Sequence, residues 1–305
     1  MNQTISTKNV ISKMDFNLND LPDDLRISTM TITCNLDTLI DIQNVGNFVD
    51  LALGSIVCVK YKTDNNKLDD NTVIRSLIKL KKTRKTKKNK AKKNFFNQAT
   101  LIVDIKNKRR VNVKVFKNGA IQMTGCKSID DFEFALTTIC SELIKKKAVY
   151  NKTDKVIQKK YFVANFTNTD PTKISNLKIR MINSNFNVGF LIDREKLYEL
   201  LIKSNIRCIY EPCIHACVNI KYLYKGKETI SVFVFESGSI IITGAKTKNH
   251  IVESYKFITK ILFENYDKII KKNVEELLER EDIKKLINES NNLNIEDLQE
   301  LCVSI

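Results

Sequence analysis

The chain has 305 residues, a net charge of +16 and an isoelectric point near 9.4. Apolar residues make up 43% of it, enough for a substantial core, and the positive charge favours a polyanionic partner, either nucleic acid or an acidic membrane surface. No segment has the roughly 20 apolar residues of a membrane span, and the N-terminus lacks a signal-peptide core. We therefore expect an intracellular protein without a membrane partner, whose eight scattered cysteines are reduced thiols.

The first half of the chain is predicted to alternate between strands and helices after a polar tail at 1–24. Period-2 alternation and short apolar runs predict strands at 25–37, 56–61, 99–105, 111–116 and 120–124. Apolar residues at helical spacing predict helices at 38–53 and 128–147, the second capped by Ser128.

Residues 62–94 interrupt this pattern and form a predicted disordered insertion. Within it, residues 79–93 contain ten basic residues and no acidic ones. Such a block repels itself and cannot bury a core. Its functional interpretation is a phosphate-binding arm or a nuclear localisation signal, and its alternative interpretation is a solubilising insertion.

The second half repeats the order of the first after a polar connection at 148–172. Predicted strands cover 177–182, 217–224, 230–235 and 239–243. Predicted helices cover 193–203 and 248–271. Residues 273–305 carry nine acidic and three basic residues, and the stretch VEELLEREDIKKLI within them has helical periodicity. We interpret this segment as an added helical appendage for protein contacts.

One segment of the chain occurs twice. Residues 111–128 read VNVKVFKNGAIQMTGCKS, and residues 230–247 read ISVFVFESGSIIITGAKT. A constant offset of 119 residues relates Phe116 to Phe235, Gly119 to Gly238, Thr124 to Thr243 and Lys127 to Lys246. A period this long is not that of a solenoid and indicates two copies of one sizeable unit.

Alternation along these strands separates two faces. The core face is predicted to hold Val111, Val113, Val115, Ile121 and Met123 in the first copy, and Val232, Val234, Ile240 and Ile242 in the second. A phenylalanine before each turn, Phe116 or Phe235, falls on the other face. That face is either a binding surface or is covered by another helix.

These residues carry a resemblance to a known family. The pattern Phe-x-x-Gly, four residues, then Thr-Gly-x-Lys occurs at 116–127 and at 235–246, and Tyr210-Glu211-Pro212 precedes the second copy. Over about 25–61 and 95–270 the chain resembles the TATA-box-binding protein family. The resemblance implies an α+β fold: a pseudo-twofold saddle of two repeats, with a curved antiparallel sheet and with helices on its convex face. The repeats would be 25–147 and 173–272.

The resemblance also implies a DNA-binding site on the concave face of the sheet, over the minor groove. Phe116 and Phe235 match two of the family's wedging phenylalanines; the positions of the other two fall on Phe96 and on His215, a smaller and more polar wedge. Thr124 and Thr243 match groove-facing threonines, and Asn176 matches a groove-reading asparagine whose counterpart, Leu25, departs from the pattern. The implied phosphate contacts are Lys127, Lys221 and Lys246. Glu211 corresponds to a surface that holds the next initiation factor.

We therefore expect a TATA-binding-type initiation factor whose partners are double-stranded AT-rich promoter DNA, general transcription initiation factors and the RNA polymerase machinery. The long insertion and the departures favour an origin in a large DNA virus, with a location in the host nucleus, a cytoplasmic viral factory or the virion. The alternatives are a nonspecific architectural DNA-binding protein, and a protein-interaction module that has lost DNA binding. Self-association through the concave face is a further alternative.

Catalytic and metal chemistry find no support in the sequence. Cys208, Cys213, His215 and Cys217 cluster, but no C-x-x-C motif occurs there, so buried thiols are the preferred interpretation over zinc. Phosphate-binding loops and nucleophile motifs are missing, and the adjacent carboxylates Asp130 and Asp131 are explained by helix capping. We expect no enzyme activity, no cofactor and no metal.

Overall fold

The computed structural model describes residues 18, 21–63, 72–79, 97–105, 109–151 and 155–271. These residues belong to two compact units. The first contains the chain up to Ser184 together with 243–251, and the second contains 185–242 and the chain from Val252 onward. None of the helices in the described part of the chain has the length and apolar composition needed to span a bilayer.

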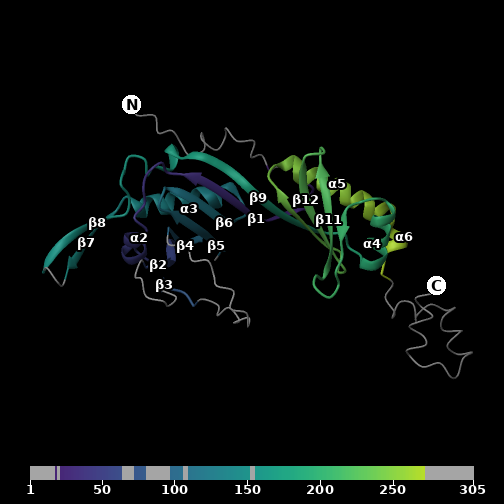
Figure 1. Ribbon diagram of the computed structural model, residues 1–305, viewed down its shortest axis with the longest axis horizontal. Coiled ribbons are helices and arrows are strands. Elements are labelled where there is room, and N and C mark those ends of the chain that lie inside the picture. The colour runs from purple at the N-terminus through teal and green to yellow at the C-terminus, as the bar shows by residue number, and fades with distance from the viewer. Residues whose placement is uncertain are drawn as a thin grey trace, which may run out of the picture. The chain divides into compact units, whose positions relative to one another are not determined.

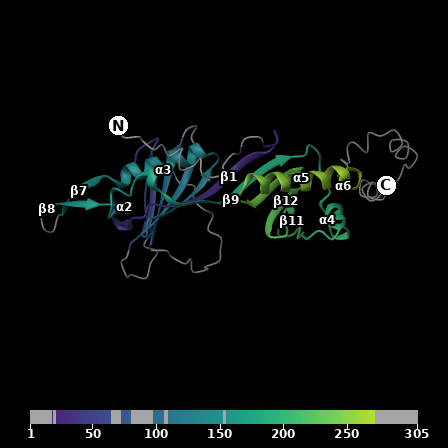
Figure 2. The same cartoon turned by 90° about the horizontal axis from the view of Figure 1, so that it is seen from above.

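The first unit is built on an antiparallel sheet (Figure 1). Its strands are β1 (Arg26–Asn35), β2 (Ile56–Lys62), β3 (Thr72–Ser76), β4 (Gln98–Ile105), β5 (Arg109–Phe116), β6 (Ala120–Cys126) and β9 (Ser175–Asn187), of which β9 leaves the unit after Ser184. They follow the order β9-β1-β6-β5-β4-β2-β3. A separate hairpin of β7 (Lys146–Asn151) and β8 (Val156–Tyr161) projects from the unit (Figures 1 and 2).

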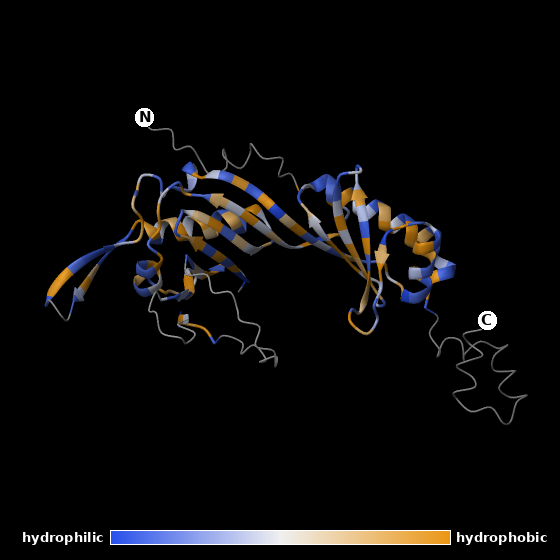
Figure 3. Cartoon of the chain, in the orientation of Figure 1, coloured by the Kyte–Doolittle hydropathy of each residue, from blue (hydrophilic) through white to orange (hydrophobic). Residues whose placement is uncertain are grey.

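Helix α3 (Ile129–Leu143) covers one face of this sheet and encloses the core of the unit (Figure 2). The five side chains predicted for the core face of β5 and β6 are at most 1% exposed. On the helix, Phe132, Leu136 and Ile139 are equally buried. Figure 3 shows the resulting alternation of hydrophobic and hydrophilic residues along the strands. Two shorter helices, α2 (Ile42–Phe48) and the 3-10 turn η2 (Pro171–Lys173), complete the unit.

The second unit repeats this construction with four strands. They are β10 (Cys208–Ile209), β11 (Cys217–Tyr224), β12 (Glu228–Phe235) and β13 (Ser239–Ala245), in that order, and β13 leaves the unit after Ile242. The helices are α4 (Arg194–Lys203), α5 (Lys248–Glu264) and α6 (Tyr266–Ile269). The predicted core residues of β12 and β13 are fully buried. Helix α5 covers their face of the sheet, and its Phe257 ring lies 4.6 Å from that of Tyr222 on β11.

Strand register shows that the sequence repeat is also a structural repeat. In β4 and β5, Gln98 pairs with Phe116, and seven further pairs follow to Ile105 and Arg109. In β11 and β12, Cys217 pairs with Phe235, and seven further pairs follow, each shifted by the same 119 residues. The prediction of an α+β fold with two repeats of antiparallel strands and covering helices is therefore confirmed.

The turn after each phenylalanine depends on a glycine. Gly119 and Gly238 both have positive φ angles, +85° and +76°, which glycine adopts without steric cost. A Cβ atom on Gly119 would overlap the carbonyl oxygen of Thr38, and one on Gly238 would overlap that of Phe190. The turn at Gly119 is thus pressed against the segment that follows β1, and the turn at Gly238 against the segment that follows β9.

Several predicted boundaries need correction. The insertion at 62–94 is not devoid of structure, because Thr72–Ser76 form β3 and pair with β2. The connection at 148–172 contains most of the β7–β8 hairpin, and the helix predicted to reach residue 147 ends at Leu143 because β7 begins at Lys146.

Two further predicted helices are shorter than expected. The helix at 38–53 spans only Ile42–Phe48, because Ile40 pairs with Val163 in a β-bridge. The helix at 248–271 is interrupted at Asn265, whose side-chain amide donates to the carbonyl of Ile261.

Some predictions fall outside the described residues. They concern the tail at 1–24 apart from 18 and 21–24, the basic block at 79–93 apart from Lys79, Phe96, and the acidic appendage at 273–305.

A partly buried ion pair holds the start of α3. Arg109 donates two hydrogen bonds to Asp131, at 2.7 and 2.8 Å, and the Lys127 N–H donates a third at 2.8 Å. Burial by itself would raise the pKa of Asp131, but these bonds and the nearby guanidinium outweigh it and hold the pKa below its ordinary value. Ser128 caps the helix as predicted by accepting from the Asp131 N–H.

We predict that Asp131→Asn lowers the free energy of unfolding near neutral pH by about 1–3 kcal/mol, because a charge-assisted bond is lost from a mostly buried site. A carboxyl with a depressed folded pKa stabilises above its unfolded pKa of about 3.9 and loses that contribution as pH falls through the folded pKa. Urea unfolding of both proteins should therefore converge in acid. Asp130→Asn, at an exposed neighbour, is the control, and a gap that persists at low pH would contradict the assignment.

We also predict that Gly119→Ala destabilises the chain by about 3 kcal/mol or more, because it adds steric overlap to an unfavourable φ. Gly54 is the matched control: its φ is +74° and its position has open space around it. Gly54→Ala should cost only about 1 kcal/mol. Urea unfolding measures both, and equal losses would show that the contact with Thr38 is unimportant.

Candidate nucleic-acid interface

The face of the sheet opposite the helices is the candidate interface. In the first unit, β5 and β6 place Asn112, Lys114, Phe116, Gln122 and Thr124 on it, all half-exposed. In the second copy of the repeat, β12 and β13 do the same with Ser231, Phe233, Phe235, Ile241 and Thr243. This face combines apolar rings with hydroxyl, amide and ammonium groups, and we name it the open face.

Phe116 and Phe235 occupy equivalent places on the open face. Each is the last residue of its strand and precedes the glycine turn. Across the sheet, Phe116 pairs with Gln98 and Phe235 pairs with Cys217, positions that are again 119 residues apart. The register therefore gives both rings the same setting at the end of a strand.

The second predicted pair of wedges is only partly described. Phe96 lies outside the described residues, two positions before Gln98. His215 lies two positions before Cys217, is exposed, and belongs to a turn in which its N–H donates to the Glu211 carbonyl at 2.8 Å. Its neighbour Ile214 is 69% exposed. Sequence reasoning missed this apolar side chain, although the 119-residue offset aligns it with Phe95.

The two predicted threonines have different surroundings. Thr124 on β6 pairs with Thr31 on β1 and with Asn112 on β5, which makes a polar row across the sheet. The hydroxyl of Thr243 donates to Asn183 Oδ1 at 2.6 Å and lies 3.7 Å from the Met181 sulfur. Each threonine thus lies beside an asparagine on its face.

The structure does not pair the predicted Asn176 with these threonines. Asn176 is exposed at the start of β9 with a φ of +51°, and the asparagine that meets Thr243 is Asn183. Asn112 and Asn219 were also not assigned a role from the sequence. Their Oδ1 atoms are buried without a hydrogen-bond partner among the described residues. Strand alternation was the signal that could have found them, since both lie on the open face.

The predicted phosphate contacts fall into two groups. Lys127 and Lys246 are exposed between the last strand of a repeat and its long helix. Their backbone N–H groups donate to the equivalent residues Asp131 and His250. Lys221 is instead half-buried on β11, and its ammonium donates to the Ser231 hydroxyl at 2.8 Å.

The predicted partner surface at Glu211 is an exposed turn. Its carbonyl oxygen accepts from the N–H groups of Ile214 and His215. Tyr210, the preceding residue, stacks near the Tyr198 ring at 5.9 Å and near the Arg194 guanidinium at 5.8 Å. These contacts fix the turn against α4.

The cysteine cluster does not form a metal site among the described residues, where no group of three His, Cys, Asp or Glu side chains is placed to hold a metal ion. Burial raises the pKa values of the half-exposed Cys208 and Cys217 thiols. The interpretation of the cluster as buried thiols is wrong for Cys213, which is exposed.

Comparison with known proteins gives consistent matches. A sequence model of the family described as "Transcription factor TFIID (or TATA-binding protein, TBP)" matches residues 72–146 and 176–265, more than half of the chain. The chain is 40% identical over 262 residues to a TATA-box-binding protein-like protein of Acanthamoeba polyphaga mimivirus, and this alignment covers 80% of the chain and 66% of that relative. It is 29% identical over 148 residues to the TATA-box-binding protein of Dictyostelium discoideum, which covers 48% of the chain and 58% of that relative.

Among solved structures, the Methanococcus jannaschii TBP matches 79% of the chain, with 99% of its own length covered, 16% identity and a TM-score of 0.48. The chain spans about two thirds of the mimivirus relative and somewhat more than half of the Dictyostelium relative. The family model matches both copies of the repeat and the strands that carry Phe116 and Phe235. The chain therefore belongs to the TATA-binding protein family.

Proposed function

We propose that the protein is a TATA-binding-type transcription initiation factor that binds AT-rich promoter duplexes in the minor groove through its open face and bends them. The observation that carries this proposal is the equivalent placement of Phe116 and Phe235, each half-exposed at the end of a core strand. Apolar side chains in such positions can enter a base step and partly unstack it, which kinks the duplex.

The polar groups of the open face suit the minor groove. A·T pairs present only acceptors there, whereas a G·C pair adds an amino donor. Hydroxyl and amide groups, such as those of Thr124, Asn112 and Asn183, can donate to the acceptors. The amino group of guanine would crowd the same face, so AT-rich sites are preferred.

The charge of the chain supports electrostatic binding to the phosphates. The first repeat is also longer than the second beside the interface: Lys60 pairs with Thr100, 40 residues later, whereas Ile209 pairs with Asn219, 10 residues later. The additional 30 residues include the basic block at 79–93. We propose that this block adds phosphate contacts next to the sheet.

The proposal extends to partners and location. Membership in the family supports a role as a non-enzymatic factor that works with the transcription machinery, and we propose Glu211 and its turn as a contact for another initiation factor. The mimivirus relative supports a viral origin, with action in the host nucleus or in a viral factory.

A nonspecific architectural role on the same fold is the second candidate. Lys114 and Gln122 pair across β5 and β6 on the open face, where they put long polar side chains between the apolar ones. His215 is likewise a weaker wedge than a phenylalanine. These residues would reduce sequence preference without preventing DNA binding.

We predict that Phe116→Ala and Phe235→Ala each weaken binding to a TATA-containing duplex by about tenfold or more, because a base–aromatic contact is worth about 1–3 kcal/mol. Each should also reduce the bend reported by energy transfer between dyes at the ends of the duplex. Phe134→Ala, at an exposed phenylalanine on α3, is the matched control and should change neither value.

The same titrations on a scrambled AT-rich duplex separate the two candidates. Equal affinities for both duplexes would reject the promoter-factor function and leave the architectural one. Absence of binding at low salt would reject both.

We predict that Lys127→Ala and Lys246→Ala each make the salt dependence of duplex binding shallower by about 0.9 in the slope of log K against log salt, because one phosphate contact is lost. Affinity should fall by a similar factor for all sequences. Lys256→Ala, at an exposed lysine on α5, is the control. An unchanged slope in the first two variants would exclude them as phosphate contacts.

A further inference from the structure

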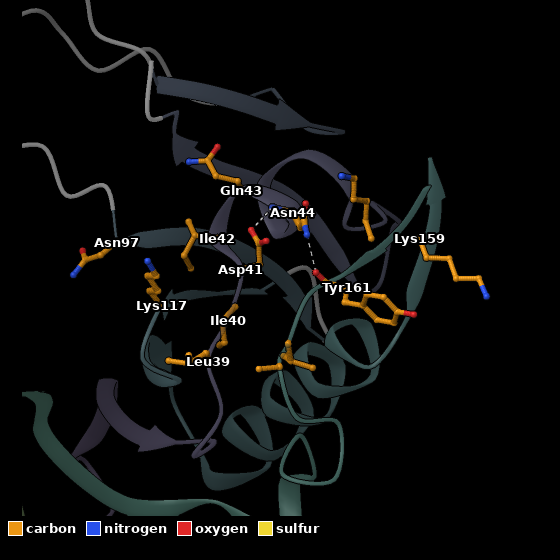
Figure 4. A pocket seen from close by; sticks show the side chains of 13 residues that line it. Leu39, Ile40, Asp41, Ile42, Gln43, Asn44, Asn97, Lys117, Lys159 and Tyr161 are labelled. Atoms are coloured by element: carbon orange, nitrogen blue, oxygen red, sulfur yellow. Dashed lines mark hydrogen bonds between the residues drawn. The ribbon is translucent and has the colours of Figure 1, made fainter. Parts of the chain in front are cut away.

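A cavity in the first unit lies apart from the open face. It has a volume of about 790 Å³ and lies between the N-terminal end of α2, the turn after Phe116 and strand β8. Figure 4 shows Lys117 and Asn97 at one side of it and Tyr161 and Lys159 at the other. None of the open-face residues named above lines it. Its lining is therefore available to a partner other than DNA in the groove.

The walls of the cavity are basic and apolar. Lys117, Lys159 and Lys160 line it, together with one acidic residue, Asp41, whose carboxylate already accepts the Asn44 N–H as the cap of α2. Within the described part of the chain, none of the three lysines has an ion-pair partner. Leu39 supplies an apolar wall that is 60% exposed.

The second unit contains the same backbone framework, which makes a direct comparison possible. Ile40 N–H donates to the Lys117 carbonyl at 2.9 Å, as Ile192 N–H does to that of Glu236. Ala164 N–H donates to the Leu39 carbonyl at 3.0 Å, as Lys271 N–H does to that of Leu191. Lys117 is thus the counterpart of Glu236, and Ala164 is the counterpart of Lys271.

In the second unit this position is closed by an internal ion-pair network. The Glu236 carboxylate accepts from Lys271 at 2.7 Å and from Arg194 at 2.8 Å. In the first unit the carboxylate is replaced by the ammonium of Lys117, and the partners are replaced by Ala164 and Ile42. The first unit therefore lacks an acidic group at the point where the second unit carries its own.

The hairpin beside the cavity exposes apolar side chains among the described residues. Along the chain the hairpin lies between α3 and Phe162, whereas in the second unit the short helix α6 follows α5 and ends at Ile269, whose carbonyl accepts like that of Phe162. Tyr150 pairs with Ile157 across the strands, and these side chains are 56% and 71% exposed. A two-stranded sheet with exposed apolar residues is marginally stable alone, and its outer edges can pair with another strand.

We propose that the cavity and the β7–β8 hairpin form a docking site for an extended segment of a protein partner in which acidic and apolar residues alternate. Its carboxylates pair with Lys117 and Lys159, and its apolar side chains cover Leu39 and Ile157, which shares a face of β8 with Lys159. Alternation along an extended segment delivers both kinds of group to one site. A DNA backbone would satisfy the lysines, but it would leave the apolar surface exposed to water.

A labelled peptide of alternating glutamate and leucine tests the site, with binding to the full-length chain measured by fluorescence anisotropy. A peptide with glutamine in place of glutamate is the probe control. We expect Lys117→Glu to lower the affinity for the acidic peptide by about tenfold or more. Leu39→Glu and Ile157→Glu should weaken it by about fivefold, and both positions are exposed, so folding is maintained.

The second unit provides the matched control. Leu191 is the counterpart of Leu39 and is also exposed, and Leu191→Glu should change peptide affinity by less than about twofold. Leu39→Glu should also leave duplex affinity unchanged, which separates this site from the DNA interface.

Four results would overturn the proposal. The first is equal affinity for the glutamate and glutamine peptides, or no binding up to about 1 mM. The second is an equal loss of affinity in Leu191→Glu. The third is displacement of the peptide by duplex together with a loss in Phe116→Ala as large as that in Lys117→Glu, which would place the peptide on the open face. The fourth is a dimer of the chain, seen by sedimentation, that dissociates in the Leu39→Glu variant, which would assign the cavity to a second copy of the chain.

Discussion

Burial of every second residue in the hairpin strands is the constraint on which the rest of the structure depends. Val115 and Val234 are fully buried beneath helices. Because successive side chains point to opposite faces of a strand, the next residue in each case must lie on the open face. The positions of Phe116 and Phe235 therefore follow from the packing of the core. A one-residue slip of register would bury both rings and expose a row of valines.

The turns that follow convert this alternation into a fixed geometry. Gly119 and Gly238 accept backbone hydrogen bonds from Leu36 and Val188, at 3.1 and 3.0 Å. The first turn is thereby tied to the segment after β1, and the second to the segment after β9. The phenylalanine before the turn is held from both sides, by cross-strand pairing and by this tether. An apolar wedge is effective only when it is held in this way, since ordering a mobile ring on binding would cost entropy.

The sequence was sufficient to predict features that depend on local patterns. Alternation identified β4, β5, β6 and their counterparts, and the 119-residue offset located the equivalent phenylalanines. The sequence pattern could not reveal β3 or the β7–β8 hairpin, because these short, polar strands are specified by their pairing and not by a hydrophobic pattern. Asn183 was missed for the same reason, since its role depends on Thr243, 60 residues away. The cavity combines residues from four separate segments, and no periodicity connects them.

The two units share a backbone framework but differ in charge at equivalent side chains. Arg109 and Asp131 pair in the first copy of the repeat, and the equivalent positions hold Glu228 and His250 in the second copy. Lys117 likewise lines an open cavity, whereas its counterpart Glu236 is held in an ion-pair network. Both differences leave the turns, caps and strand pairs intact, so the shared backbone framework accommodates either arrangement of charge. A duplicated fold can thus keep the same open face in both halves while the edges of the two halves diverge in charge.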